Sequence, residues 1–317
     1  MASDAIPPRT WLLTTTLLIL GAAGVIVGIN VALDPYGLYR ATEGRRLVAY
    51  GDARIAKYLL NVRHVPENFN AVLIGSSVSA NWDMTRVEKL RTYNDSLNGG
   101  NIVEGKVLLD VAISKPGIST VFLLVHPALT ASHDYKTVAL TPDLRRSALG
   151  SLSLWEAYKD MIKVRLHRSP SWGTFDYAGT ETLEHIPSEM NPDMKKLWRP
   201  GDTFDVDPAA LAAYREAIHE LRAKRLQIVF VVPPTAEDVL QPKRAAFDRY
   251  VQLIRGDSTA DDTWIDFTSD VYAAFRRNRM HFPDGSHLNT EAARKLVSYI
   301  NAAINDWLQR LSRRVPA

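Results

Sequence analysis

The segment from Trp11 to Leu33 limits the fold most, because it contains no charged side chain. At about 1.5 Å rise per residue, a helix over this segment can cross a hydrocarbon core of about 30 Å. A cleaved signal peptide is the alternative, but its apolar part spans only about 7–15 residues and ends at a small-x-small site. No convincing site of that kind precedes Asp34. We therefore predict an uncleaved transmembrane helix over 11–33, preceded by a cytoplasmic N-terminus over 1–10.

The basic residues around this segment bear on its orientation. Arg9 is the only basic residue before it, whereas Arg40, Arg45 and Arg46 follow soon after. Taken literally, the positive-inside rule places the rest of the chain in the cytoplasm. The rule is weak for large translocated domains, so the residues alone leave the orientation open.

The composition excludes several classes of protein. With 46% hydrophobic and 23% charged residues among 317, the chain can bury a substantial core. The net charge of +3 comes without a dense Lys/Arg block, so we expect no nucleic-acid partner. The chain has no cysteine, which excludes disulfides, thiolate metal sites and cysteine nucleophiles. No His/Asp/Glu cluster has ligand spacing, so we expect neither a metal nor a cofactor.

Short apolar runs bounded by turn or polar residues alternate with segments of helical periodicity after residue 70. The predicted strands are Ala71–Gly75, Thr92–Leu97, Thr120–Val125, Leu226–Val232 and Thr263–Phe267, and the predicted helices include Asn101–Ser114, Ser153–Leu166, Pro208–Arg225 and Thr290–Leu311. This alternation predicts an α/β fold, in which a parallel sheet is covered on both faces. Sites in such sheets lie at the carboxyl ends of strands.

The same pattern suggests how the chain is divided. We predict a linker and lead-in helix over 34–69, and one main domain over 70–317. At about 127–207 the pattern loosens and Pro, Gly and polar residues become frequent, which favours an insertion within that domain. Trp172 and Trp198 in this insertion could line a glycan groove, but we favour buried anchors of an irregular loop.

Three serines follow the first predicted strand of the sheet, in "LIGSSVSANW". A serine hydroxyl is a poor nucleophile until a base accepts its proton and N–H groups stabilise the oxyanion. We assign Ser77 as the candidate nucleophile. Ser76 and Ser79 are interpreted as local hydrogen-bonding residues that cap the following helix.

A candidate base lies near the other end of the chain, in "HFPDGSHLN". Asp284 precedes His287 by three residues in a turn, so its carboxylate can fold back and fix the imidazole tautomer. We predict that Ser77, His287 and Asp284 form a triad. Asn289 is interpreted as the N-cap of the last helix, and His281 as an ordinary histidine.

These motifs resemble the SGNH, or GDSL-like, hydrolase superfamily. "IGSSVS" is similar to the first block of that family, with Ser76 in place of its aspartate and Ser77 as its nucleophile. "DGSHLN" is similar to the last block, with Asp284 and His287. "YNDSLNGG" is similar to the second block, and the resemblance implies that Gly99 and the Ser77 amide are the oxyanion donors.

The third block of the family, Gly-x-Asn-Asp after the third strand, is missing. The corresponding segment reads "LLVHPALTAS". The asparagine that normally contacts the oxyanion is therefore absent or replaced by another group. His126 ends this predicted strand and is either an ordinary histidine or that replacement.

The resemblance implies a three-layer, flavodoxin-like domain. With its apolar N-terminal segment, the chain is similar to the single-pass members of the superfamily that act with membrane-bound O-acyltransferases on cell-envelope or secreted polysaccharides. This implies transfer of an acyl group, acetyl or similar, to a glycan through an acyl-serine. It also implies a C-terminal domain outside the cytoplasmic membrane, in the periplasm. O-acylesterase activity, with water as the acceptor, and a non-catalytic glycan- or partner-binding subunit of a modification or export complex are the alternatives.

One competing motif is "GNIVEGKV", which has the G-x-x-x-x-G-K spacing of a phosphate-binding loop. Val107 replaces the Ser or Thr that would hold magnesium, and the glycines fall inside an apolar helical pattern. We therefore do not predict nucleotide binding.

Overall fold

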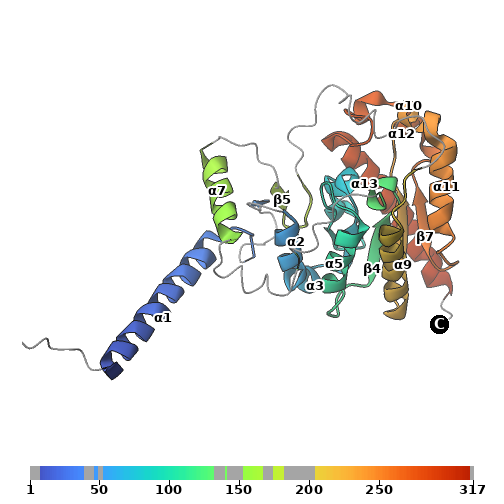
Figure 1. The fold of residues 1–317 in the computed structure, drawn as a ribbon. Helices are drawn as coiled ribbons and strands as arrows, with labels where there is room; N and C mark the ends of the chain where they lie inside the picture. Colours follow the sequence, from blue (N-terminus) through green and yellow to red (C-terminus); the bar gives the residue numbers. More distant parts are fainter. Residues whose placement is uncertain are drawn as a thin grey trace, which may run out of the picture.

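The main domain is built on a five-stranded sheet in a computed structural model that describes residues 8–38, 46–48, 53–131, 140, 153–166, 174–181 and 204–314. The strands are β2 (Ala71–Ile74), β3 (Thr92–Asn94), β4 (Thr120–Leu124), β6 (Gln227–Val232) and β7 (Thr263–Asp266). All neighbours pair in parallel, in the order β3-β2-β4-β6-β7 (Figure 1). This is the flavodoxin-like order, which confirms the predicted fold class.

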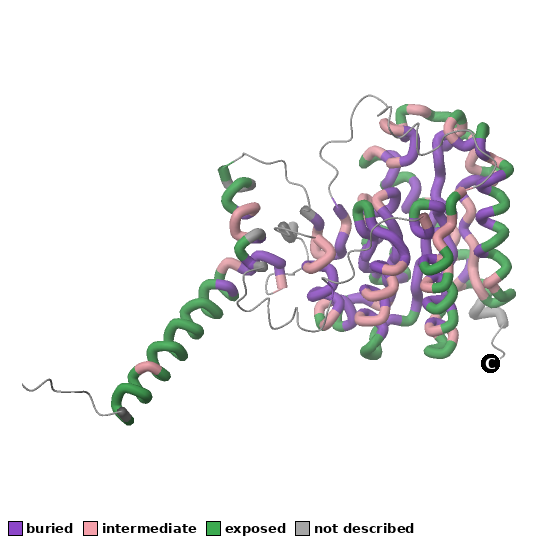
Figure 2. The backbone as a smooth tube through the Cα atoms, in the orientation of Figure 1, coloured by how far each residue is buried: buried purple, intermediate pink, exposed green. Residues whose placement is uncertain are grey.

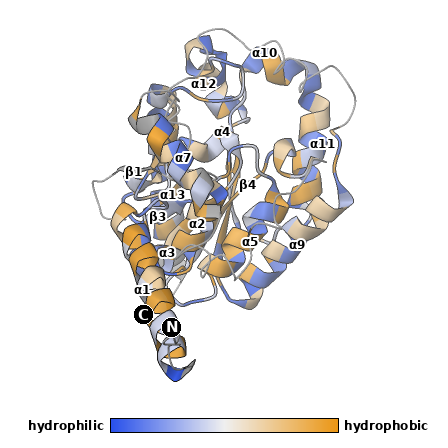
Figure 3. Cartoon of the chain, turned by 60° about the vertical axis from the view of Figure 1, so that its left-hand side comes forward, coloured by the Kyte–Doolittle hydropathy of each residue, from blue (hydrophilic) through white to orange (hydrophobic). Residues whose placement is uncertain are grey.

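Every residue of β2, β3 and β4 is buried, because helices cover both faces of the sheet. The helices of the domain are α2 (Ala53–Asn61), α3 (His64–Asn68), α4 (Ser77–Ala80), α5 (Ile102–Ala112), α9 (Pro208–Ala223), α10 (Glu237–Leu240), α11 (Arg244–Arg255), α12 (Ala273–Arg277) and α13 (Thr290–Arg314). The helices α2, α5 and α9 pack in a row (Figure 3), whereas α13 packs against β7 and the 3-10 turn η1 (Met84–Arg86). Each strand of the five-stranded sheet lies within its predicted range, whereas two further strands, β1 (Arg46–Val48) and β5 (Thr174–Asp176), were not predicted.

The N-terminal helix α1 (Pro8–Leu33) projects from the domain and exposes most of its apolar side chains (Figures 1 to 3). It is long and apolar enough to cross a membrane, by length and composition. Only a small share of it is buried, which distinguishes it from a core helix. A membrane anchor and a signal sequence both have these properties.

Part of the predicted insertion at about 127–207 lies within the described residues. It includes the 3-10 turn η2 (Pro127–Leu129), α7 (Ser153–Arg165) and β5 (Thr174–Asp176), which pairs antiparallel with β1 (Arg46–Val48). Phe175 and Ala178 of this segment belong to the hydrophobic core. Trp172 and Trp198 lie outside the described residues. The division into domains stays a prediction.

The "GNIVEGKV" segment begins α5 rather than a phosphate-binding loop. The Asn101 side chain accepts from the amides of Val103 and Glu104, and the Glu104 carboxylate accepts from the Asn101 amide, which makes a capping box. A Cβ at Gly105 would lie 2.8 Å from the Ile74 side chain. This glycine therefore permits close packing of α5 on β2.

Candidate active site

Ser77 is placed at the carboxyl edge of the sheet by the sharp turn between β2 and α4. It is the first residue of α4, two residues after Gly75. A Cβ at Gly75 would collide with the hydroxyls of Ser79 and Ser96, so only glycine lets this turn pass so close to the segment after β3. The amide of Ser77 has no partner within the helix, because amides of the first helical turn have none.

The structure brings Ser77, His287 and Asp284 together in one chain of hydrogen bonds. The His287 Nε2 atom lies 2.9 Å from the Ser77 Oγ atom, and its Nδ1 atom lies 2.5 Å from an Asp284 carboxylate oxygen. The Asp284 carboxylate accepts a hydrogen bond from the Nδ1–H group. The Nε2 atom can therefore accept a hydrogen bond from the serine hydroxyl. The His287 side chain is 18% exposed, so the site is open to a substrate.

Backbone groups hold Asp284 in position. Its second carboxylate oxygen accepts from the amides of Ser286 and His287, at 3.0 and 2.8 Å. Gly285 has a φ of +97°, a conformation that strongly favours glycine and lets the turn close. Burial opposes ionisation of the Asp284 carboxyl, but the His287 imidazole and the two amides outweigh it and hold the pKa of Asp284 below its ordinary value.

Residues 95–100 after β3, which we call the oxyanion loop because they carry the predicted donor Gly99, run beside the turn that leads to Ser77. Ser76 forms a parallel bridge with Leu97, and the Leu97 amide donates to the Gly75 carbonyl at 3.1 Å. Gly99, two residues further along, is exposed with a φ of +62°. The loop thus lies against the turn that leads to Ser77, and the oxyanion role of Gly99 and the Ser77 amide stays a prediction.

Side chains of helix α2 hold the oxyanion loop in place. The sequence did not lead us to predict this contact. The buried Lys57 ammonium donates to the carbonyls of Asn94 and Ser96 at 3.1 and 2.6 Å, and lies 3.7 Å from the Glu181 carboxylate. Arg54 donates to the Asn98 carbonyl at 3.1 Å. The signal available in the sequence was the spacing of these two cations, which share a face of the amphipathic helix.

Asp95 is a fully buried carboxyl within this loop, and the Asn61 amide donates to it at 2.5 Å. Burial raises the pKa of Asp95 to about 7, although Lys57 and Asn61 oppose the shift. An aspartate in the unfolded chain titrates near about 3.9. Between these pH values the folded chain binds more protons than the unfolded chain, so Asp95 makes the fold less stable as pH rises from about 4 to about 7.

Asp95→Asn is therefore expected to stabilise the fold at pH 8 and to have little effect at pH 4. The gain at pH 8 should amount to a few kcal/mol, since one pKa unit corresponds to about 1.4 kcal/mol. Urea denaturation of both chains at the two pH values measures it. An equal difference at pH 4 and pH 8 would show that the Asp95 carboxyl does not change its protonation across this range.

The interpretation of Ser76 and Ser79 as helix caps was wrong. The Ser76 Oγ atom has no hydrogen-bond partner among the described residues, and Ser76 makes no side-chain cap to α4. The Ser79 hydroxyl lies 2.7 Å from that of Ser96 and donates to the Ser76 carbonyl. Ser79 lies inside α4 rather than at its N-cap, and its hydroxyl ties α4 to the oxyanion loop.

The interpretation of Asn289 as a cap is confirmed, since its side chain accepts from the Ala292 amide at 2.8 Å. His281 makes only local contacts, with the Phe275 carbonyl and the Asn278 side chain, each at 3.0 Å. These contacts fit an ordinary histidine.

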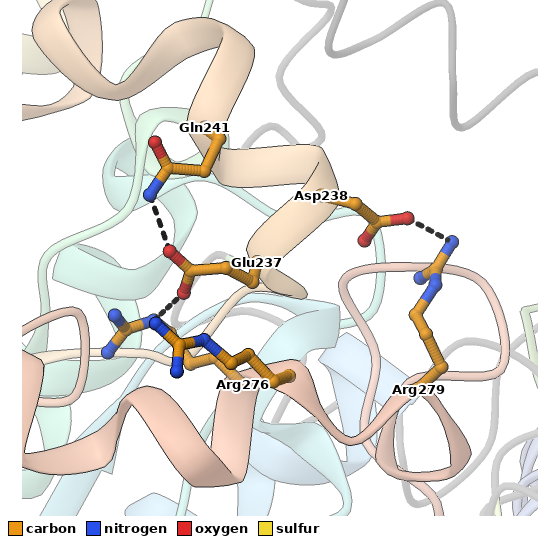
Figure 4. Close-up of a pocket in the computed structure, with 6 residues that line it drawn as sticks. Glu237, Asp238, Gln241, Arg276 and Arg279 are labelled. Carbon is orange, nitrogen blue, oxygen red and sulfur yellow. Dashed lines mark hydrogen bonds and ion pairs between the residues drawn. The ribbon is translucent and has the colours of Figure 1, made fainter.

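A charged pocket lies next to the turn that carries Asp284 and His287 (Figure 4). It is lined by Glu237, Asp238, Gln241, Arg276, Arg277 and Arg279. The Ala236 amide, which precedes α10, donates to the Gly285 carbonyl at 3.0 Å and so ties the pocket to that turn. Arg276 pairs with Glu237 at 2.8 Å and Arg279 pairs with Asp238 at 3.1 Å. These pairs support the turn from the side of α10.

No family model and no curated protein matches the sequence. Among solved structures, a protein described as a platelet activating factor from Streptococcus pneumoniae has 12% identity and a TM-score of 0.45, over 81% of this chain and 91% of the other. A GDSL-like lipase from Bacteroides thetaiotaomicron has 8% identity and a TM-score of 0.37, over 76% and 88%. A protein from Desulfitobacterium hafniense, described as a lipolytic protein of the G-D-S-L family, has 7% identity and a TM-score of 0.39, over 74% of this chain and 99% of the other. These are likenesses of fold alone.

Proposed function

We propose that this chain is an SGNH-type serine enzyme that forms an acyl-serine at Ser77. The observation that carries the proposal is the hydrogen-bonded chain from Ser77 through His287 to Asp284. Residues from the two ends of the domain, in the two motifs that resemble the first and last SGNH blocks, meet at the carboxyl edge of the parallel sheet. Sites of α/β sheets lie at this edge.

The geometry supports a two-step acyl transfer. The Ser77 Oγ atom attacks the carbonyl carbon of an ester, and its proton passes to the His287 Nε2 atom. The bond between the carbonyl carbon and the leaving oxygen then breaks, and His287 returns the proton to that oxygen. In the second step an acceptor hydroxyl attacks the carbonyl carbon of the acyl-serine and gives its proton to His287. The bond between that carbon and the Ser77 Oγ atom then breaks, and His287 returns the proton to Oγ. Asp284 keeps the imidazole in the required tautomer throughout.

We further propose that the acceptor is a sugar hydroxyl of a cell-envelope or secreted glycan, with the acyl group supplied through a membrane-bound O-acyltransferase. Helix α1 supports this, because an anchor would keep the domain beside a membrane-bound donor. With water as the acceptor, the same site would be an O-acylesterase. A non-catalytic binding subunit is the second candidate, and the missing third block favours it.

The enzyme and its location can be tested in one experiment. Cells expressing the full chain are treated with a membrane-impermeant fluorophosphonate, intact and after lysis, alongside cells expressing Ser77→Ala. We expect the wild-type chain to be labelled in intact cells and the Ser77→Ala chain not at all. Label that requires lysis would place the domain in the cytoplasm, as the basic residues after α1 would have it. Wild-type label equal to that of Ser77→Ala would favour the non-catalytic subunit.

Intact-mass spectrometry of the same full chain, in detergent, separates transfer from hydrolysis. The acetyl adduct from a model ester should disappear faster with an acetyl-accepting oligosaccharide than in buffer. Loss at the same rate in both would identify an esterase.

A further inference from the structure

His126 follows β4, the strand beside β2, and Ser77 follows β2. In the parallel register of β2 and β4, Ile74 pairs with Leu123. Ser77 follows Ile74 by three residues, and His126 follows Leu123 by three. The oxyanion loop lies on the other side of Ser77, beyond β2. The segments that carry Gly99 and His126 thus follow the two strands on either side of β2, at the same edge of the sheet as Ser77.

The hydrogen bonds of His126 fix its tautomer. Its Nδ1 atom accepts from the Ala128 amide at 3.3 Å, which caps the turn η2, so the ring hydrogen must be on Nε2. The Tyr250 hydroxyl donates to the His126 carbonyl at 3.0 Å and holds the backbone. The side chain is buried, and burial lowers the pKa of His126 to about 3. A positive charge on His287 lowers this pKa further, so the two imidazoles are close enough to interact.

We propose that the Nε2–H group of His126 is the side-chain oxyanion donor of this site, in place of the asparagine of the missing third block. When the Ser77 Oγ–carbon bond forms, the π electron pair of the carbonyl moves to its oxygen. That oxygen accepts hydrogen bonds from the amides of Ser77 and Gly99 and from His126, which keeps its proton. This role rests on the proposed acyl-serine chemistry.

A neutral imidazole is suited to this task. It donates a hydrogen bond but does not protonate the oxyanion, and neutral histidines serve other enzymes in this way. Because His126 stays neutral well into the acid range, it does not take up the proton that Ser77 gives to His287. A purely structural role, as the cap of η2, is the alternative to be tested.

An asparagine and an aspartate at this position separate the two roles. Both side chains can accept from the Ala128 amide, since both are good N-caps, but only the asparagine can donate to an oxyanion at pH 8. The full chain in detergent is treated with a fluorophosphonate, and the rate of Ser77 phosphonylation is measured for wild type, His126→Asn and His126→Asp.

We expect His126→Asn to react within about tenfold of wild type, and His126→Asp at least about 10²-fold more slowly, which is the cost of one lost oxyanion donor. With p-nitrophenyl acetate, the loss should fall on kcat rather than on KM. Thermal unfolding shows that each variant is folded.

Equal rates for the asparagine and aspartate variants, whether near wild type or equally slow, would overturn the donor role. A wild-type chain that forms no Ser77 adduct would instead overturn the proposed function, and the donor role with it.

Discussion

Replacing His287 with alanine is expected to lower the rate of Ser77 acylation by at least about 10³-fold, the usual cost of removing a triad member. The reason is geometric, since the His287 Nε2 atom is the group that lies 2.9 Å from the Ser77 hydroxyl. Without a base, the hydroxyl keeps its proton and remains a poor nucleophile. Acylation by p-nitrophenyl acetate, followed as the nitrophenolate burst of the full chain, measures the rate.

His281→Ala is the matched control for this prediction. His281 lies six residues earlier in the same segment, and its ring hydrogen-bonds to the Phe275 carbonyl and the Asn278 side chain. We expect its acylation rate to stay within a few-fold of wild type. If the two variants lose activity equally while both remain folded, the base has been assigned to the wrong histidine.

Lys57→Met is expected to destabilise the fold by about 3–5 kcal/mol, because removing one partner of a buried ion pair leaves the other charge uncompensated. The Lys57 side chain is fully buried and the Glu181 side chain is 7% exposed, so water cannot replace the lost contact. The acylation rate should fall as well, because the carbonyls of Asn94 and Ser96 lose their anchor and the oxyanion loop with them. Urea denaturation and the nitrophenolate burst measure the two effects.

Two further variants divide the stability effect from the positioning effect. Lys57→Met combined with Glu181→Gln removes the uncompensated charge, so it should recover stability while acylation stays slow. Arg63→Met, just after α2, removes a cation whose side chain is 81% exposed and should cost no more than about 1 kcal/mol. Full recovery of the acylation rate in the double variant would show that Lys57 does not position the oxyanion loop.

The proposed acyl transfer depends on three sources of hydrogen bonds around Ser77: the acid–base pair, the oxyanion loop and β4. The oxyanion loop follows β3, His126 follows β4, and the acid–base pair lies in the turn before α13. A parallel sheet brings them together because consecutive strands point the same way and end at the same side. The triad residues alone would leave the developing negative charge without enough donors.

The sequence by itself determined the local elements and the candidate triad. Strand ranges such as Ala71–Gly75 were predicted because buried parallel strands are short, continuous apolar runs. Ser77, Asp284 and His287 were found because each motif lies within a few residues, and spacing that short fixes which side chains can meet. The catalytic roles of these residues and of Gly99 stay predictions.

Only the tertiary structure decided the contacts between segments far apart in the sequence. Lys57 donates to a carbonyl of the oxyanion loop, and the Ser79 hydroxyl contacts that of Ser96 instead of capping α4. His126 follows the strand that pairs with the one before Ser77. Periodicity reports which face of an element is buried, but strand order and register determine what lies opposite that face. The role of Lys57 could not be assigned from the sequence, because two of its partners are backbone carbonyls, which every residue carries, and the third, Glu181, lies far along the chain.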